Sequence, residues 1–171
     1  MKNYDNYTDT GGTLLADGKK LSKDDNLVEA IGTMDEVNSF LGVIYAQLTG
    51  DDLKFMIDQI QRNICQINAV LGNARAEFEK SKVLALEQMI QKLEAGLPPL
   101  NHFLLSGSGF ISAHIQFARA LVRRAERRIG ALRVEDQNIL PFLNRLSDMF
   151  FLMARTTDKR EKRSERQWNE G

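Results

Sequence analysis

The chain has few of the residues that build disulfides and metal centres. Its 171 residues include one cysteine, Cys65, and two histidines, His102 and His114. One cysteine excludes an internal disulfide and a cysteine-based zinc site, and two histidines argue against a histidine-rich centre. Cys65 follows Ile64 in an apolar pattern, so we expect a small, partly buried hydrophobic residue and not a nucleophile. His102 has no triad or ligand partner nearby in the sequence and receives no catalytic role.

Proline, net charge and long apolar runs are also scarce. Three prolines argue against a linker-rich protein, and 23 basic against 23 acidic residues argue against generic binding of nucleic acid. No apolar run approaches the roughly 18 residues that cross a bilayer. Residues 1–5 show no apolar signal-peptide core, so we expect a cytoplasmic protein without a membrane partner.

Apolar residues recur every three or four positions along most of the chain, which is the spacing of one helix face. Asp51 is expected to cap the second of the resulting helices, and Gly96 is expected to end the third. No strand pattern of useful length is evident. The predicted helices are 25–48, 53–76, 83–97, 111–129 and 139–155.

Five amphipathic helices predict one all-α domain built as a five-helix antiparallel bundle with crossing angles near roughly 20°. The apolar content of 43% is ordinary for a globular protein and sufficient for a full core. We divide the single domain, 1–171, into an N-terminal loop (1–22), a helical bundle (23–157) and a polar C-terminal extension (158–171). The extension has no apolar face, so we expect either a solvated helix extension or a frayed tail.

Rows of polar side chains flank the core-facing positions of three predicted helices. Taken singly, each is most simply a solvated helix charge, with pairs worth only a few tenths of a kcal/mol. Aligned rows instead favour a contact with another subunit or a ligand. The rows are Ser112, Arg119, Arg123 and Glu126; Arg124 and Arg128 on the opposite flank; Asp35 and Asn38; and Asn144, Asp148 and Arg155.

Two glycine-rich segments lie outside the helices. Residues 7–13, rich in Gly and Thr, could bring backbone N–H groups close to phosphate oxygens, although the segment is not a Walker loop. Taken alone, it is better interpreted as a disordered leader. Residues 106–109 could form a turn in which Ser108 caps the next helix, or could place that helix's N-terminus against an anion.

Three strings occur together and in order: Gly-Thr-Met-Asp-Glu at 32–36, Arg-Arg-Ala-Glu-Arg-Arg at 123–128, and Leu-Asn-Arg-Leu-Ser-Asp at 143–148. With the N-terminal loop they span nearly the whole chain. Together they resemble the ATP:cob(I)alamin adenosyltransferase family, of the kind associated with propanediol utilisation and with human methylmalonic aciduria type B. The resemblance implies a ferritin-like or cobalamin adenosyltransferase-like bundle, assembled as a homotrimer with ATP and the corrinoid between subunits.

The resemblance also implies an activity. The family transfers the 5′-deoxyadenosyl group of ATP to the cobalt of cob(I)alamin, which gives adenosylcobalamin and triphosphate. Cobalt(I) is itself the nucleophile, so no Ser, Cys or His nucleophile is needed. Mg²⁺ would arrive bound to ATP, and no side chain is assigned as its ligand. A cobalamin reductase and an adenosylcobalamin-dependent enzyme are the implied protein partners.

By the same resemblance, several residues would hold ATP. The phosphates would contact the loop of Thr10, Gly11, Gly12 and Thr13, together with Lys23, Arg123 and, more weakly, Arg127. Asn144 would bind the nucleotide or the shell of its metal, and Glu126 would support the site and its arginines.

Three residues are implied in handling the corrinoid. Asp35 and Arg119 would pair across the subunit interface, and with Arg123 and Glu126 they make up the expected catalytic set. Phe103, which taken alone is a core or interface aromatic residue, would form the apolar wall that displaces the lower axial ligand of the corrinoid.

The sequence also departs from the family pattern. The leader 8–13 lacks an arginine that the family usually carries, and 106–109 lacks the usual proline. An alternative function is therefore a non-catalytic corrinoid- or ATP-binding chaperone or sensor on the same fold. Without the resemblance, a helical scaffold or RNA-binding bundle would remain, with salt-sensitive binding that the zero net charge disfavours.

Overall fold

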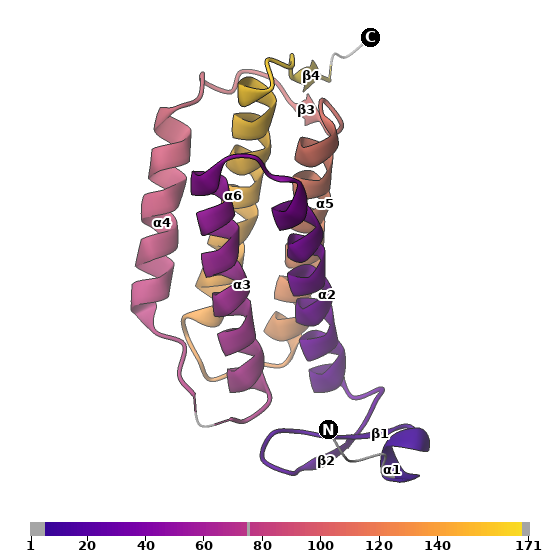
Figure 1. Ribbon diagram of the computed structural model, residues 1–171. Helices are drawn as coiled ribbons and strands as arrows, with labels where there is room; N and C mark the ends of the chain where they lie inside the picture. The colour runs from indigo at the N-terminus through magenta and orange to yellow at the C-terminus, as the bar shows by residue number, and fades with distance from the viewer. Residues whose placement is uncertain (1–5, 75, 169–171) are drawn as a thin grey trace.

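The computed structural model describes residues 6–74 and 76–168 (Figure 1). Residues 1–5, on which the signal-peptide prediction rests, lie outside the described residues, as does the end of the extension at 169–171. Most of the described chain is helical, and five long helices run side by side. They are α2 (Asn26–Gln47), α3 (Asp51–Leu71), α4 (Lys80–Ala95), α5 (Phe110–Ala131) and α6 (Ile139–Arg160).

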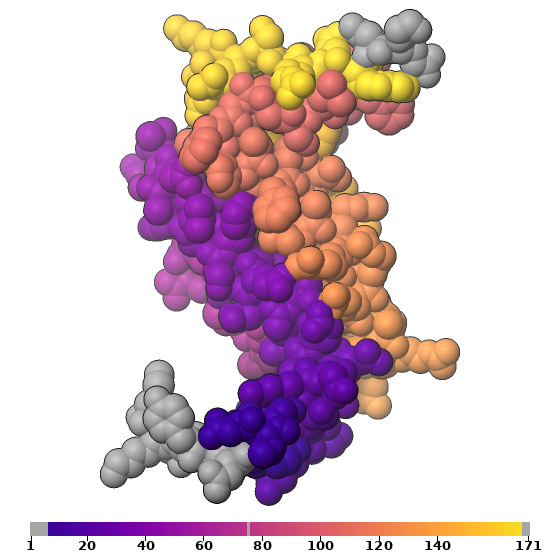
Figure 2. All heavy atoms as spheres, turned by 90° about the vertical axis from the view of Figure 1, so that its right-hand side faces the viewer, coloured from indigo at the N-terminus to yellow at the C-terminus, as the bar shows by residue number. Residues whose placement is uncertain are grey.

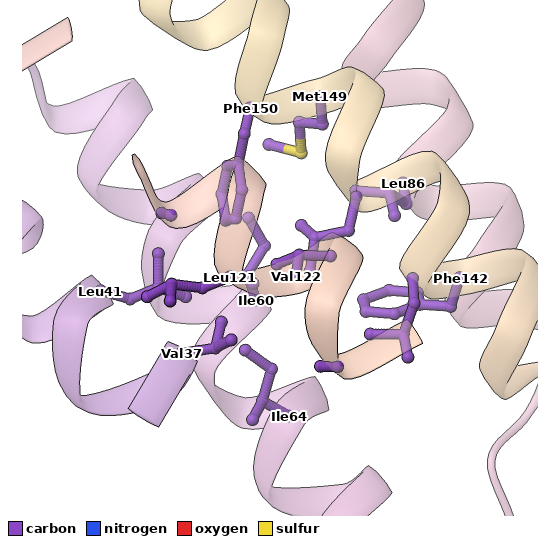
Figure 3. Close-up of a cluster of buried hydrophobic side chains, with 14 of the residues drawn as sticks. Val37, Leu41, Ile60, Ile64, Leu86, Leu121, Val122, Phe142, Met149 and Phe150 are labelled. Atoms are coloured by element: carbon purple, nitrogen blue, oxygen red, sulfur yellow. The ribbon is translucent and has the colours of Figure 1, made fainter. Parts of the chain in front are cut away.

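The expected five-helix bundle is confirmed. Helix α5 packs between α2 and α6, α3 packs on α2, and α4 packs on α6. Successive long helices run in opposite directions (Figure 1). The apolar stripes of all five helices meet in one core, and each large side chain buried there contributes about 1.5–3 kcal/mol. Figure 3 shows part of this core, including Val37 of α2, Ile60 and Ile64 of α3, and Phe142 and Phe150 of α6.

Two expected caps and one expected end differ from the structure. Gly50, not Asp51, precedes α3, so the Asp51 carboxylate lies in the first helical turn. Helix α5 is capped at Gly109, whose amide donates to the hydroxyl of Ser112 at 3.0 Å, while the Ser108 hydroxyl accepts from the Arg166 amide instead. Helix α3 ends at Leu71 and does not reach residue 76, because the chain turns there into a left-handed conformation at Asn73, with φ 58°.

The N-terminal segment is folded, which corrects the expectation of a disordered leader for the described residues. A short helix α1 (Asn6–Asp9) precedes strands β1 (Gly12–Leu14) and β2 (Lys20–Ser22), which pair antiparallel. Strands of three residues are too short to show an alternating pattern, so they could not be predicted. We call residues 10–23 the N-terminal hairpin.

The start of the C-terminal extension is also folded. Helix α6 continues to Arg160, with Thr157 and Asp158 buried. The chain then turns back, and β4 (Arg166–Gln167) pairs antiparallel with β3 (Leu104–Leu105). Residues 158–160 therefore continue the helix, and the largely exposed residues that follow are held by strand pairing and do not form a frayed tail.

The N-terminal hairpin and the C-terminal segment lie at opposite ends of the bundle (Figure 2). Within the described part of the chain, no helix has the length and apolar character needed to span a bilayer.

Candidate functional site

The arginines of α5 divide between two faces of the helix. On one face, Arg124 forms an ion pair with Glu36 and Arg128 forms one with Glu29, so both bind α2. These two arginines therefore have a structural role within the bundle. Their placement on the flank opposite Arg123 agrees with the helical spacing of the sequence.

Arg119, Arg123 and Arg127 lie on the other face. Among the described residues, none of these three forms an ion pair with an acidic side chain, and Arg119 donates only to the side-chain oxygen of Gln116 at 2.8 Å. Burial lowers the pKa of Arg119, and the nearby positive charge of Arg123 lowers it further. A guanidinium remains charged despite such a shift. This face consequently presents three arginines that form no ion pair with any acidic side chain of the described residues.

A groove of about 870 Å³ runs beside Arg119 and Arg123, between α4, α5 and α6. Its walls combine charged and apolar side chains, which suits a ligand with both characters. The other lining residues include Glu87, Arg145, Asp148, Phe151, Leu152 and Arg155.

The structure brings together Glu126 of α5 and Asn144 of α6, two of the expected site residues. The Asn144 amide nitrogen donates to Glu126 Oε1 at 3.3 Å. Arg145 donates to the Asn144 side-chain oxygen at 2.9 Å and to Glu87 at 3.2 Å. The network fixes which way the Asn144 amide faces, so that its orientation is set before a ligand arrives.

The N-terminal hairpin gathers Thr10, Gly11, Gly12 and Thr13 with Lys23. The Lys23 amide donates to the Gly11 carbonyl, and its ammonium group donates to the Thr8 carbonyl, both at 2.8 Å. Gly11 has φ 89°, and a Cβ on Gly12 would clash with the Tyr7 ring, so both positions require glycine. The hairpin therefore has the backbone geometry of a tight, glycine-dependent turn with a lysine beside it.

Phe103 directly precedes β3, which lies at the other end of the bundle from the hairpin (Figure 1). Its side chain is 77% exposed, so it is not a core residue. Asp35 is exposed on α2, and no ion pair joins it to Arg119 within the described chain. Within one chain, the expected site residues thus lie in separate places: in the N-terminal hairpin, on α5 and α6, on α2, and beside β3.

Sequence reasoning missed two sets of contacts that hold the C-terminal segment. Trp168 contacts Phe103, although it lies in a charged segment that carries no helical or strand pattern. Arg155, expected on a polar flank, is 5% exposed and donates to Glu165 at 2.6 Å and to the Pro98 carbonyl at 2.9 Å. These contacts tie the C-terminal segment to α6 and to the loop after α4.

Cys65 is exposed, which corrects the expectation of a partly buried residue. It lies one position beyond Ile64, and a step of one residue turns the side chain about 100° away from the core stripe of α3. The amide nitrogen of Asn38 contacts the Cys65 sulfur at 3.6 Å.

The chain matches the family model described as cobalamin adenosyltransferase over residues 4–157. It belongs to this family. Corrinoid adenosyltransferase MMAB from Bos taurus is 36% identical over 175 residues, covering 94% of this chain and 73% of the relative. Corrinoid adenosyltransferase from Bacillus subtilis is 36% identical over 171 residues, covering 94% of this chain and 88% of the relative.

Solved structures of the family share the fold. A phenylalanine-to-alanine variant of PduO-type ATP:corrinoid adenosyltransferase from Lactobacillus reuteri, complexed with cobalamin and ATP, superimposes with a TM-score of 0.89. It is 28% identical, with 99% of this chain and 100% of that chain covered. An arginine-to-lysine variant from the same organism, complexed with ATP, gives a TM-score of 0.88 at 30% identity, covering 98% of this chain and 100% of that one. The family resemblance of the three sequence strings is thereby confirmed, and the roles of individual residues stay predictions.

Proposed function

We propose that this chain transfers the 5′-deoxyadenosyl group of ATP to the cobalt of cob(I)alamin. The family match and the corrinoid adenosyltransferases among its relatives support this activity. The structural observation that carries it is the face of α5 with Arg119, Arg123 and Arg127, whose charges no acidic side chain of the described residues neutralises. A polyphosphate is a fitting partner for such a face.

The reaction needs little chemistry from side chains. The electron pair of cobalt(I) forms a bond to the 5′-carbon of ATP, while the bond from that carbon to the phosphate oxygen breaks and its electrons leave with triphosphate. The protein must hold the carbon in line with cobalt and stabilise the negative charge that builds on the leaving group. Arginine side chains at a half-buried groove serve the second purpose.

Each group of residues then has a role in the proposal. The N-terminal hairpin, with Thr10–Thr13 and Lys23, holds the phosphates through backbone N–H groups and one ammonium group. Arg123 binds the departing triphosphate, with Arg127 nearby. Asn144, oriented by Glu126, binds the nucleotide or the water shell of the Mg²⁺ that ATP carries.

The proposal includes assembly into a homotrimer. The hairpin and β3, which Phe103 directly precedes, lie at opposite ends of the bundle, so a second copy is the simplest way to complete a site that uses both (Figure 1). Asp35 of one copy would pair with Arg119 of the next, which explains why each lacks an ionic partner within the described chain. Phe103, being exposed, is free to face a corrinoid bound there.

A direct assay tests the activity. The protein is incubated with ATP, Mg²⁺ and chemically reduced cobalamin under exclusion of oxygen, and the absorbance change that accompanies alkylation of cobalt is followed. Release of one triphosphate per alkylated cobalt is the expected result. Tight binding of ATP and cobalamin without alkylation would instead favour the chaperone or sensor function.

A further inference from the structure

The turn of the N-terminal hairpin reaches across to the end of α3. A cavity of about 550 Å³ lies between them, lined by Leu15 and Lys19 of the turn and by Leu27, Val70 and Leu71 of the bundle. Because the cavity lies between the turn and the bundle, the polar contacts at its edge help to fix the position of the hairpin on the bundle.

One carboxylate at this edge serves two segments at once. Asp17 Oδ1 accepts from the Lys19 amide at 2.9 Å and closes the turn, while Asp17 Oδ2 accepts from the Asn73 side-chain amide at 2.6 Å. The bond from Asn73 is also the main cause that lowers the pKa of Asp17. Asn73 occupies a left-handed position, φ 58°, directly after the C-cap of α3, a conformation that Asn and Asp adopt more readily than most residues.

We infer that the Asp17–Asn73 hydrogen bond is a latch that sets the position of the N-terminal hairpin on the bundle and thereby the affinity for ATP. The inference rests on the proposed function, in which the same hairpin holds the phosphates. Thr13 lies on β1 and Lys23 directly follows β2, the two strands that the latched turn joins, so a shift of the turn moves both. Asp17 and Asn73 are positioning residues, because they act through the hairpin and not on ATP directly.

The chemistry of the pair suggests a swap experiment. Asp17→Asn replaces the charge-assisted bond from Asn73 to a carboxylate by a weaker bond between neutral groups, and the new amide nitrogen can meet Asn73 only if the Asn73 amide turns over to present its oxygen. In Asn73→Asp, two carboxylates face each other and repel. The double variant Asp17→Asn/Asn73→Asp restores both bonds, because the new amide accepts from Lys19 and donates to the new carboxylate.

The measurements are the KM for ATP, the KM for cob(I)alamin, kcat, and hydrogen exchange of the peptide 10–23. Each single variant should raise the KM for ATP about three- to tenfold, the range expected for one hydrogen bond, with kcat and the corrinoid KM near the parent values. Exchange of the hairpin should be faster. The double variant should return the ATP KM and the exchange rate toward the parent.

Asp58→Asn is the matched control. Asp58 is another solvent-accessible carboxylate that accepts side-chain hydrogen bonds, from Arg62 at 2.8 Å and from Gln59 at 3.4 Å, but it lies on α3 away from the hairpin. An unchanged ATP KM in both single variants, or faster exchange without any change in ATP affinity, would overturn the inference. If the parent lacks adenosyltransferase activity, the proposed function fails, and the dissociation constant of Mg–ATP measured by calorimetry on the same variants still decides whether the latch exists.

Discussion

The main-chain amide of Trp168 donates a 2.8 Å hydrogen bond to the carbonyl oxygen of Phe103, and the two rings meet edge to face with their centroids 6.1 Å apart. The contact continues the pairing of β3 with β4. The Arg166 guanidinium adds a 2.9 Å bond to the Ser106 carbonyl. The end of the chain therefore holds the loop that carries the proposed corrinoid wall.

Replacing Phe103 by alanine should separate corrinoid handling from nucleotide binding. Phe103→Ala should leave ATP affinity nearly unchanged, because no ATP-binding group is proposed at that end of the chain. It should sharply slow adenosylation that starts from cobalt(II), since the exposed ring is proposed to displace the axial ligand and so ease reduction. Rates with cobalt(II) under a reducing system are compared with rates on pre-reduced cobalt(I). Equal losses in the two assays would contradict this role.

Arg123 and Arg124 offer an adjacent test and control on α5. Arg123→Lys keeps the charge but replaces a rigid fork of donors by a point charge, and should lose about 2–4 kcal/mol of transition-state stabilisation if the site is dry. Arg124→Lys should be nearly silent, because lysine can still pair with Glu36 on the opposite face. Turnover and ATP affinity are measured under saturating reduced cobalamin. If both variants have the turnover and ATP affinity of the parent, the proposal that Arg123 of α5 binds the triphosphate is wrong.

The helices could be predicted because each carries a long, regular apolar pattern. The core positions of α3 and α6, such as Ile64 and Phe150, follow directly from that spacing. The strands could not be predicted, because two or three residues are too few for a pattern. The sequence left open whether α6 continues past Arg155, because the residues buried there, Thr157 and Asp158, are polar and lie in a highly charged segment.

Only those features of the site that depend on helical spacing or on the three sequence strings could be predicted. The grouping of arginines on α5, and the flank on which Asn144 lies, follow from helical periodicity. The contacts of Asp17 with Asn73 and of Phe103 with Trp168 join residues more than 50 positions apart, and no local pattern signals such pairs. Only the folded chain reveals them.

Asp35 provides a test of assembly. It is exposed on α2, so Asp35→Ala should change the free energy of unfolding little. It should weaken trimer formation or corrinoid affinity, because the proposed Arg119 of the neighbouring copy loses its partner. Sedimentation equilibrium of parent and variant measures the first effect, and cobalamin titration measures the second. A stable parent monomer at micromolar concentration would exclude the proposed trimer.

Asp52 should stabilise the bundle at neutral pH and not in strong acid. Arg160 donates two bonds to it, at 2.8 and 2.6 Å, and these lower its pKa from 3.8 to about 2. The stabilisation is complete above pH 3.8 and is lost as pH falls through about 2. Solvent screening limits the contribution of the Asp52–Arg160 pair to the free energy of unfolding to about 0.2–1 kcal/mol. Asp52→Asn should thus lower Tm at pH 7 more than at pH 2. The control is Asp51→Asn in the same helical turn: it removes no bond to Arg160, so its effect on Tm should not include the loss of that ion pair.

Asp158 should show the opposite dependence on pH. Burial raises its pKa above 3.8, Glu161 and Glu165 raise it further, and the hydroxyls of Ser112 and Ser108 partly oppose the shift. Its Oδ1 has no hydrogen bond of good geometry among the described residues. The folded state therefore holds the proton more tightly than the unfolded chain, so the ionised carboxylate costs stability as pH rises from 3.8 through the raised pKa.

Asp158→Asn removes that charge at nearly constant size. It should raise Tm at pH 7, where the parent carboxylate is held in its less favoured ionised form, and leave Tm unchanged at pH 3, where the parent is already neutral. Thermal unfolding at the two pH values measures the difference. The Arg163 side chain packs against Gly109 beside Asp158 and is the nearby cation that could reverse the sign. A lower Tm at pH 7 would show that Arg163 stabilises the ionised carboxylate, and Arg163→Gln should then abolish the effect of Asp158→Asn.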